Sequence, residues 1–194
     1  MSSETHEGFT QGTADLRRAG LCFIDVETTG SIFGYHEIID IEVVRTLAGG
    51  EEVVNEWRRR VRPMYPDRIT PKAATLNGYD PKLWEGAPVS STELWEEFNH
   101  ITRGCVAVCH NPSFERAFIS IAARQSGVAD LELDYHWIGT ESLAWPLYIR
   151  GLVGGLSLGE LSTYFGLAKE PLPHTAIRGA RACLEVYRRL VLLR

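Results

Sequence analysis

Two carboxylates interrupt an apolar strand near the start of this chain, and this feature most limits what the chain can fold into. Residues 21–26 are apolar on both faces apart from one acid, which predicts a strand buried inside a sheet. Asp25 and Glu27 are two positions apart, so their side chains share a face at about 6 to 7 Å. Like charges this close favour a bound hard cation with oxygen ligands. A solvated edge strand is the disfavoured alternative.

Composition limits the class of protein. The 194 residues, 44% of them hydrophobic, suit one globular domain, and we expect residues 1–18 to be a flexible tail and residues 19–194 to form that domain. A net charge of -5 argues against coating nucleic acid through a basic surface, but it suits an acidic site that binds metal. No apolar run approaches the about 18 residues of a membrane span and no signal peptide is evident, so we expect a cytoplasmic protein.

The four cysteines offer a weak metal motif. Cys105, Cys109 and His110 lie close in sequence, but both cysteines belong to one apolar strand pattern, and the chain lacks zinc-knuckle spacing. The other two, Cys22 and Cys183, also lie in apolar segments. We therefore expect buried, reduced thiols.

A second and a third strand are predicted at residues 36–46 and 53–61, and short turns make the three strands an antiparallel meander. Asp40 and Glu42 alternate in the second strand, so they form either a second metal site or a solvated strand face. The solvated face is favoured because no further ligand motif follows. The four arginines of residues 58–62 either track a phosphate backbone or protect an edge strand from association, and the two interpretations are equal.

The remaining segments alternate between strand and helix patterns. Strands are predicted at residues 105–109 and 131–138, and helices at residues 70–78, 91–101, from 112, 140–147, 157–166 and 175–192. The first helix has an N-cap at Thr70, a proline at Pro71 and a terminal Gly78. Together the segments predict an α/β fold, a mixed five-stranded sheet with helices on both faces.

Three motifs resemble those of the DEDDh (DnaQ-like) 3′–5′ exonucleases. Residues 23–30, Phe-Ile-Asp-Val-Glu-Thr-Thr-Gly, resemble the first motif. Residues 110–115 resemble the second, His-Asn-x-x-Phe-Asp, and residues 174–176 resemble the start of the third, His-x-Ala-x-x-Asp. The resemblance extends over about residues 20–191 and implies a ribonuclease H-like fold.

The resemblance implies a metal-dependent 3′–5′ exonuclease that releases 5′-mononucleotides from single-stranded DNA or RNA 3′ ends. Asp25, Glu27 and Glu115 would hold Mg²⁺ or Mn²⁺ in a two-ion site. His174 would act as the general base. A lone histidine before a helix is more often structural, but the other motifs favour catalysis. A polymerase would be a candidate protein partner, and no membrane is implied.

The resemblance also implies a set of substrate-binding residues: Thr28, Thr29, Gly30, Leu76, Asn77, His110, Asn111 and Phe114. Leu76 would wedge against the terminal base, and Asn77 would lie near the sugar. The alternative is that residues 70–78 form only a connecting helix.

The chain departs from the family pattern at two of the acids. Glu115 stands in place of aspartate, and its extra methylene displaces the carboxylate by about 1 Å. Gly179 stands in place of the final aspartate, and the next acid, Glu185, lies about 240° further round the helix. We expect a weakened metal pair. The competing interpretation is a catalytically impaired homologue that binds nucleic-acid ends or a protein.

Overall fold

The computed structural model describes residues 15–168, 173 and 176–192. Most of the predicted tail and His174 therefore lie outside the described residues. Within them, five strands form one mixed sheet: β1 (Leu21–Thr28), β2 (Ile38–Thr46), β3 (Val53–Arg60), β4 (Val106–Cys109) and β5 (Trp137–Gly139). The strand order is β3-β2-β1-β4-β5, and β1 runs antiparallel to β2 and parallel to β4. The predicted meander and the central place of β1 are confirmed.

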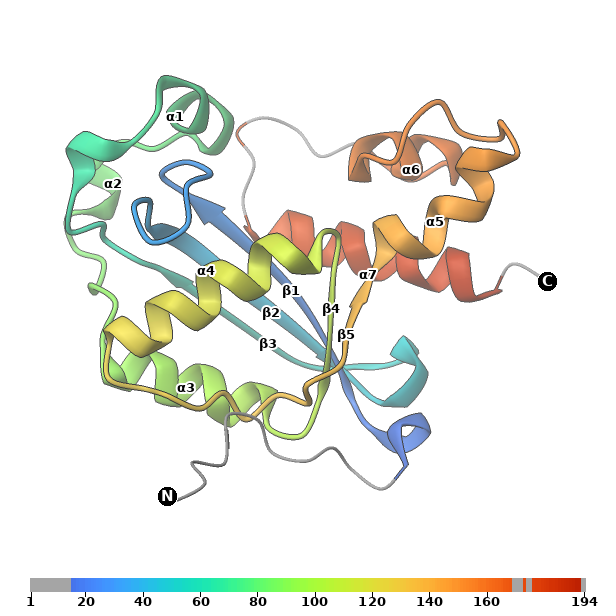
Figure 1. Cartoon of the computed structure of the whole chain (residues 1–194), viewed down its shortest axis with the longest axis horizontal. Helices are drawn as coiled ribbons and strands as arrows, with labels where there is room; N and C mark the ends of the chain where they lie inside the picture. The colour runs from blue at the N-terminus through green and yellow to red at the C-terminus, as the bar shows by residue number, and fades with distance from the viewer. Residues whose placement is uncertain (1–14, 169–172, 174–175, 193–194) are drawn as a thin grey trace, which may run out of the picture.

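Helices cover both faces of the sheet, as the sequence predicts (Figure 1). They are α1 (Pro71–Asn77), α2 (Pro81–Trp84), α3 (Thr92–Thr102), α4 (Pro112–Gln125), α5 (Thr140–Ile149), α6 (Leu158–Tyr164) and α7 (Ala176–Leu192), with short 3-10 turns η1 (Leu16–Arg18), η2 (Ala48–Gly50) and η3 (Pro66–Arg68). Helices α3 and α4 lie on one face and α7 on the other. None of these helices is long and apolar enough to span a membrane.

The alternation of β1 decides what each face receives. Cys22, Ile24 and Val26 pack into the core beneath α3 and α4, whereas Phe23 packs against α7, with its ring centroid 5.3 Å from that of Tyr187. Side chains two apart share a face. Asp25 and Glu27 therefore continue the row of Phe23 on the α7 side of the sheet. The four cysteines are free and buried, as predicted.

Helix α1 begins and ends at the predicted cap residues, and α6 has a cap that was not predicted. Thr70 Oγ1 accepts a hydrogen bond from the backbone N–H of Ala73 at 3.1 Å, and Gly78 ends α1 with a φ of 64°. A capping box of Ser157 and Glu160 begins α6. Both helix starts are thus fixed by their own sequence.

The predicted fifth strand is too long. Of residues 131–138 only the last two belong to β5, because Asp134 makes a local turn. Its carboxylate accepts the backbone N–H of His136 at 2.9 Å, while its own N–H donates to the Cys105 carbonyl at 2.8 Å. Helix α5 begins at Thr140, as predicted, and ends at Ile149, two residues later than predicted.

The prediction of a solvated face at Asp40 and Glu42 is wrong. Their exposed fractions are 2% and 0%, because α7 packs across β1 and β2. The Arg58 guanidinium pairs with Asp40, with Nε 3.0 Å from Oδ1. Glu42 lies directly opposite Asp25 in the β1–β2 register, and neither of its carboxylate oxygens has a hydrogen-bond partner. Burial raises the pKa of Glu42 to about 8, although Arg58 acts in the opposite direction.

The arginines of β3 are engaged within the chain. Besides Arg58, Arg59 pairs with Glu97 at 2.6 Å, and the Arg60 guanidinium lies 4.8 Å from the ring centroid of Trp84. Because β3 is an edge of the sheet, these contacts favour the edge-protecting interpretation.

We predict that Glu42→Gln makes the free energy of unfolding fall less steeply as pH rises. The folded pKa of Glu42 is raised from 4.5 to about 8, so its contribution is complete below the lower value and is lost as pH rises through the higher one. Between pH 4.5 and about 8, Glu42 lowers the free energy of unfolding by about 1.4 kcal/mol for each unit of rising pH. Urea unfolding of metal-free protein from pH 5 to 7.5 measures the slope.

The matched control is Glu51→Gln, which changes an exposed acid and should keep the slope of the parent protein. Equal slopes for the parent and Glu42→Gln would show that Glu42 ionises normally in the folded chain.

Candidate active site

A cleft of about 490 Å³ opens where the parallel strands β1 and β4 end. Carboxyl ends of neighbouring parallel strands meet at one edge of a sheet, so chemistry from separate motifs collects there. The predicted residues that line the cleft are Asp25, Glu27, His110, Asn111, Phe114 and Glu115, and Ser157, Ser162 and Gly179 lie opposite them on the α6 and α7 side. All three predicted metal ligands of the described chain therefore share one cleft.

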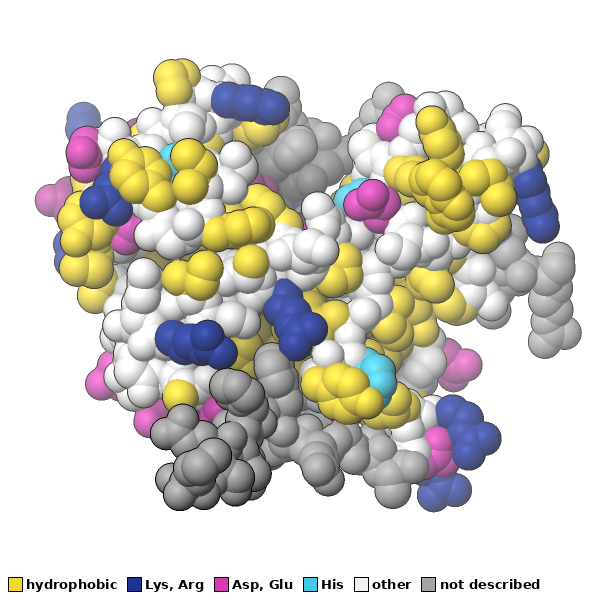
Figure 2. All heavy atoms as spheres, viewed as in Figure 1, with side chains coloured by type: hydrophobic (Ala, Val, Ile, Leu, Met, Phe, Trp, Pro, Cys, Tyr) yellow, Lys and Arg dark blue, Asp and Glu magenta, His cyan; other side chains and the backbone are white. Residues whose placement is uncertain are grey.

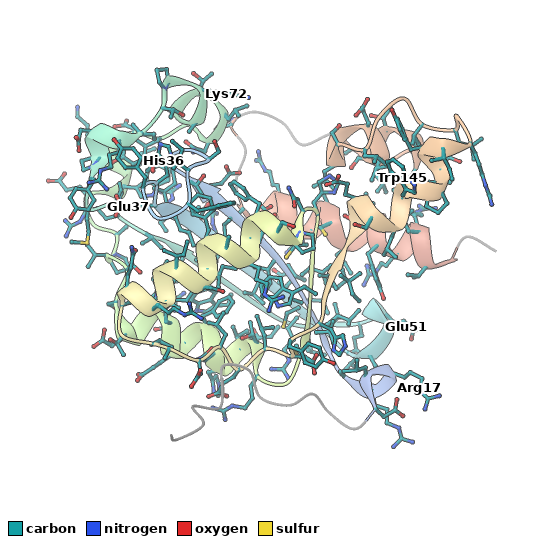
Figure 3. All side chains as sticks on the ribbon, in the orientation of Figure 1. Arg17, His36, Glu37, Glu51, Lys72 and Trp145 are labelled. Carbon is teal, nitrogen blue, oxygen red and sulfur yellow. The ribbon has the colours of Figure 1, made fainter. Side chains whose placement is uncertain are left out.

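A second cleft, of about 250 Å³, adjoins the first and shares Val26, Glu27 and Phe114 with it. Its other walls are the β1–β2 turn and α1, with lining residues Thr28, Gly30, Ser31, Thr70, Lys72, Ala73, Leu76 and Asn77. Figure 3 shows Lys72 on α1. Most of the predicted substrate-binding residues thus line the two joined clefts.

Glu115 is the most deeply buried of the three acids, with 5% of its surface exposed. Burial raises the pKa of its carboxyl to about 8, and the backbone N–H groups that begin α4 lower it to a smaller extent. Its Oε2 atom is buried without a hydrogen-bond partner. A buried carboxylate oxygen without a hydrogen-bond partner, in a cleft that two further acids also line, fits a hard cation.

In the part of the chain that the structure describes, no three His, Cys, Asp or Glu side chains are already close enough to hold an ion. The donor set nevertheless has the right chemistry, because Mg²⁺ and Mn²⁺ prefer carboxylate oxygens. One or two of these carboxylates, completed by water and substrate phosphate oxygens, would suffice for Mg²⁺.

Gly179 lies against the carboxylate of Asp25. A Cβ atom added at residue 179 would be 2.3 Å from Asp25 Oδ2 and 2.6 Å from its Cγ. Glycine within a helix costs about 1 kcal/mol relative to alanine, and this close approach accounts for its presence. Sequence reasoning noted only the missing acid. Any side chain at 179, aspartate included, must displace Asp25.

The turn after β1 is held by its own side chains. Thr28 Oγ1 donates to the Gly30 carbonyl at 2.7 Å, and Thr29 Oγ1 accepts the backbone N–H of Glu37 at 2.9 Å. A Cβ atom at Gly30 would lie 2.5 Å from the His36 ring, so only glycine fits. Thr29 is fully buried and lines neither cleft, so this predicted substrate-binding residue shapes the turn instead.

Two of the α1 residues that line the second cleft differ in exposure and in hydrogen bonding. Leu76 lines the second cleft and is 37% exposed, as a base-contacting residue must be. Asn77 is buried, and its side chain donates to the Thr28 carbonyl at 3.1 Å and accepts the backbone N–H of Tyr79 at 3.2 Å. Asn77 thus fixes α1 to β1, and its amide is already occupied.

His110 is positioned by α5. Its Nδ1 lies 2.9 Å from Thr140 Oγ1, and burial lowers its pKa. Asn111 is exposed at the start of α4. Sequence reasoning missed Lys72, because a single lysine in a short helix has no periodic signal, and Ser157, whose capping motif announces a helix start but no cleft.

We predict that Gly179→Ala destabilises the metal-free protein by about 1–3 kcal/mol, the usual cost of overpacking. The added methyl group must push the Asp25 carboxylate aside, and this outweighs the helix preference of alanine. Urea unfolding measures the change. The control is Gly159→Ala in α6, where an added Cβ meets nothing within 4 Å and stability should hold or rise. Equal stability of the two variants would contradict the close approach.

Known proteins resemble the chain over most of its length. The RNase_T family model, described as Exonuclease, matches residues 22–187. A DNA polymerase III PolC-type of Caldanaerobacter subterraneus subsp. tengcongensis is 28% identical over 163 residues, which are 84% of this chain and 11% of the polymerase. A putative bifunctional exonuclease/endonuclease protein of Mycobacterium tuberculosis is 26% identical over 182 residues, 91% of this chain and 27% of that protein. The chain spans a minor part of either relative.

Solved structures share the fold at low identity. The nuclease domain of 3'hExo, a DEDDh family member, bound to rAMP, has a TM-score of 0.69 at 18% identity and covers 92% of this chain and 94% of its own. E. coli Exonuclease I in complex with a dT13 oligonucleotide has a TM-score of 0.76 at 13% identity and covers 90% of this chain and 41% of its own. They confirm the ribonuclease H-like fold. Because the family match runs from β1, with Asp25 and Glu27, into α7, with Gly179, the protein belongs to the RNase_T exonuclease family.

Proposed function

We propose that the protein is a metal-dependent 3′–5′ exonuclease that releases 5′-mononucleotides from single-stranded nucleic acid. One observation carries the proposal: Asp25, Glu27 and Glu115 line a single cleft, and Glu115 keeps a buried oxygen without a hydrogen-bond partner. Three acids along one cleft concentrate negative charge there. They suit a site that binds a cation together with a phosphate.

Asp25, Glu27 and Glu115 would hold Mg²⁺ or Mn²⁺, which when bound stabilises negative charge on the phosphate and the leaving oxygen. Glu115 must lose its proton to bind a cation. Because its pKa is raised to about 8, metal affinity should rise as pH increases from 6 to 8. Because Gly179 supplies no carboxylate, we expect a second ion to bind more weakly. The close approach of α7 to Asp25, which leaves no room for a side chain at residue 179, is consistent with this.

The remaining roles concern the proton and the terminal nucleotide. His174, outside the described residues, would take the proton from the attacking water. Leu76 and Phe114 line the second cleft and would contact the terminal base. Lys72 on the same wall would face a phosphate.

The relatives indicate a substrate class and a partner. One neighbour was solved with rAMP and another with a dT13 oligonucleotide, so a 3′ end of either RNA or DNA suits the fold. PolC-type polymerases contain a region similar to this chain, which supports a polymerase as partner. An impaired homologue that binds nucleic-acid ends without cutting them is the competing function, and the contact between Gly179 and Asp25 favours it.

We predict that Asp25→Asn abolishes nuclease activity and weakens Mn²⁺ binding by more than about 100-fold, beyond the effect of losing an outer-shell partner. The amide keeps the size of the side chain but removes its charge. Calorimetric Mn²⁺ titration and degradation of a 5′-labelled oligonucleotide test the two parts separately. Asp130→Asn, which changes an exposed acid, should match the parent in both. Unchanged Mn²⁺ affinity in Asp25→Asn would place the metal elsewhere, and an inactive parent that binds oligonucleotide would favour the impaired homologue.

We predict that His174→Ala lowers the turnover number by about 10² to 10⁴, the usual effect of losing a general base. Its Mn²⁺ affinity should stay within about twofold of the parent, because histidine is not in the proposed ligand set. Single-turnover kinetics at saturating Mn²⁺ measure the rate. A variant that cleaves at the parental rate would assign the proton transfer to another group.

A further inference from the structure

Exposed aromatic side chains and one arginine gather beside the second cleft on two segments far apart in sequence. We name this surface the aromatic rim and define it as Ile32, Phe33, Tyr35, Met64, Tyr65 and Arg68. Phe33, Tyr35 and Tyr65 are 49%, 47% and 45% exposed. Figure 2 shows hydrophobic side chains on this part of the surface, around the α1 end of the molecule, with basic side chains beside them.

The aromatic rim is held in place by side-chain hydrogen bonds to its backbone. The ring of His36 is buried, and its Nδ1 accepts the backbone N–H of Ile32 at 2.8 Å. The Glu37 carboxylate accepts the backbone N–H groups of Met64 and Tyr65 at 2.9 and 2.8 Å. Figure 3 shows His36 and Glu37 side by side at this end of the molecule. A surface fixed in this way loses little conformational entropy on binding.

Arg68 gives the aromatic rim a positive charge between two rings. Its guanidinium carbon lies 3.7 Å from the ring centroid of Tyr65 and 4.6 Å from that of Tyr35, and Nη1 donates to the Tyr35 carbonyl at 3.2 Å. Within the described residues, no carboxylate pairs with it. Because the guanidinium covers one face of each ring, a base would stack on the opposite face, while a phosphate could pair with the cation.

The aromatic rim is continuous with the clefts. The Phe33 ring centroid lies 6.0 Å from that of Phe114, which lines both clefts. Ser31, just before the rim residues in sequence, lines the second cleft. A strand whose terminal nucleotide occupies the clefts therefore meets the aromatic rim with its preceding nucleotides.

We propose that the aromatic rim binds single-stranded nucleic acid upstream of the 3′ end by stacking its bases on Tyr35 and Tyr65 and pairing a phosphate with Arg68. This rests on the proposed function. Stacked bases must be unpaired, so the aromatic rim selects single strands longer than the clefts alone can hold. Each stacked base strengthens binding by roughly tenfold.

The test compares a dinucleotide, which fills only the clefts, with a decanucleotide, which also reaches the aromatic rim. The probes are 5′-fluorescein oligo(dT) and oligo(U) of both lengths with Mn²⁺, read as kcat/KM, and the decanucleotides without metal, read by anisotropy. Tyr35→Ala should weaken decanucleotide binding and kcat/KM about tenfold and leave the dinucleotide within twofold. Arg68→Ala should reduce the salt dependence of binding by about one charge.

Two further variants separate stacking from folding. Tyr35→Phe keeps the ring and should keep parental affinity. Tyr148→Ala removes a similarly exposed ring, 43% exposed, from α5, where its neighbour Trp145 lies away from the aromatic rim in Figure 3, and should match the parent on both lengths.

The outcomes separate this inference from the proposed nuclease activity. Equal losses on both lengths in Tyr35→Ala, or no loss on either, would overturn the aromatic rim as a nucleic-acid track, and the second result would leave a protein partner as its occupant. A parent that cuts neither length defeats the exonuclease. In that case, the proposal for the aromatic rim is supported if the parent binds the decanucleotide and Tyr35→Ala weakens that binding. It is overturned if the parent does not bind the decanucleotide.

Discussion

The structure depends on β1, which places most of its side chains in the core and two of them, Asp25 and Glu27, in the candidate active site. β1 is the central strand, and its apolar residues pack against α3 and α4 on one side and α7 on the other. That packing carries Asp25 and Glu27 to the edge where β4 also ends. The burial that stabilises the sheet therefore also brings acids to a place where a cation would offset their repulsion.

The contact between α7 and β1 links the core to the chemistry. Ala180 and Cys183 of α7 pack against the sheet around Phe23, while Gly179, one residue before Ala180, lies against the Asp25 carboxylate. The helix cannot move away from Asp25 without opening the apolar layer around Phe23. Hydrophobic packing of α7 against the sheet consequently determines how closely the helix approaches Asp25.

The sequence predicted those features that interactions between neighbouring residues determine. The apolar run of β1 and the short turns after it predicted the three-stranded meander, and the cap residue Thr70 marked a helix start that the structure confirms. The failures involve distant partners. Glu42 looked solvated because α7, which buries it, comes far later in the chain. The predicted fifth strand is interrupted at Asp134, whose backbone N–H binds the distant Cys105 carbonyl while its carboxylate makes a turn with His136. Gly179 could be seen as a missing acid, but its contact with Asp25 exists only after the helix has docked.

Glu37 joins two segments that are far apart in sequence. Its carboxylate binds the backbone of Met64 and Tyr65, 27 and 28 residues away, while its own N–H is held by Thr29. These bonds form only once the meander is complete, so the surface they support is a property of the whole native fold. A ligand that binds this surface would find no such binding site in the unfolded chain. It would therefore raise the thermal stability of the entire domain by mass action, in proportion to the logarithm of its concentration once it is in excess.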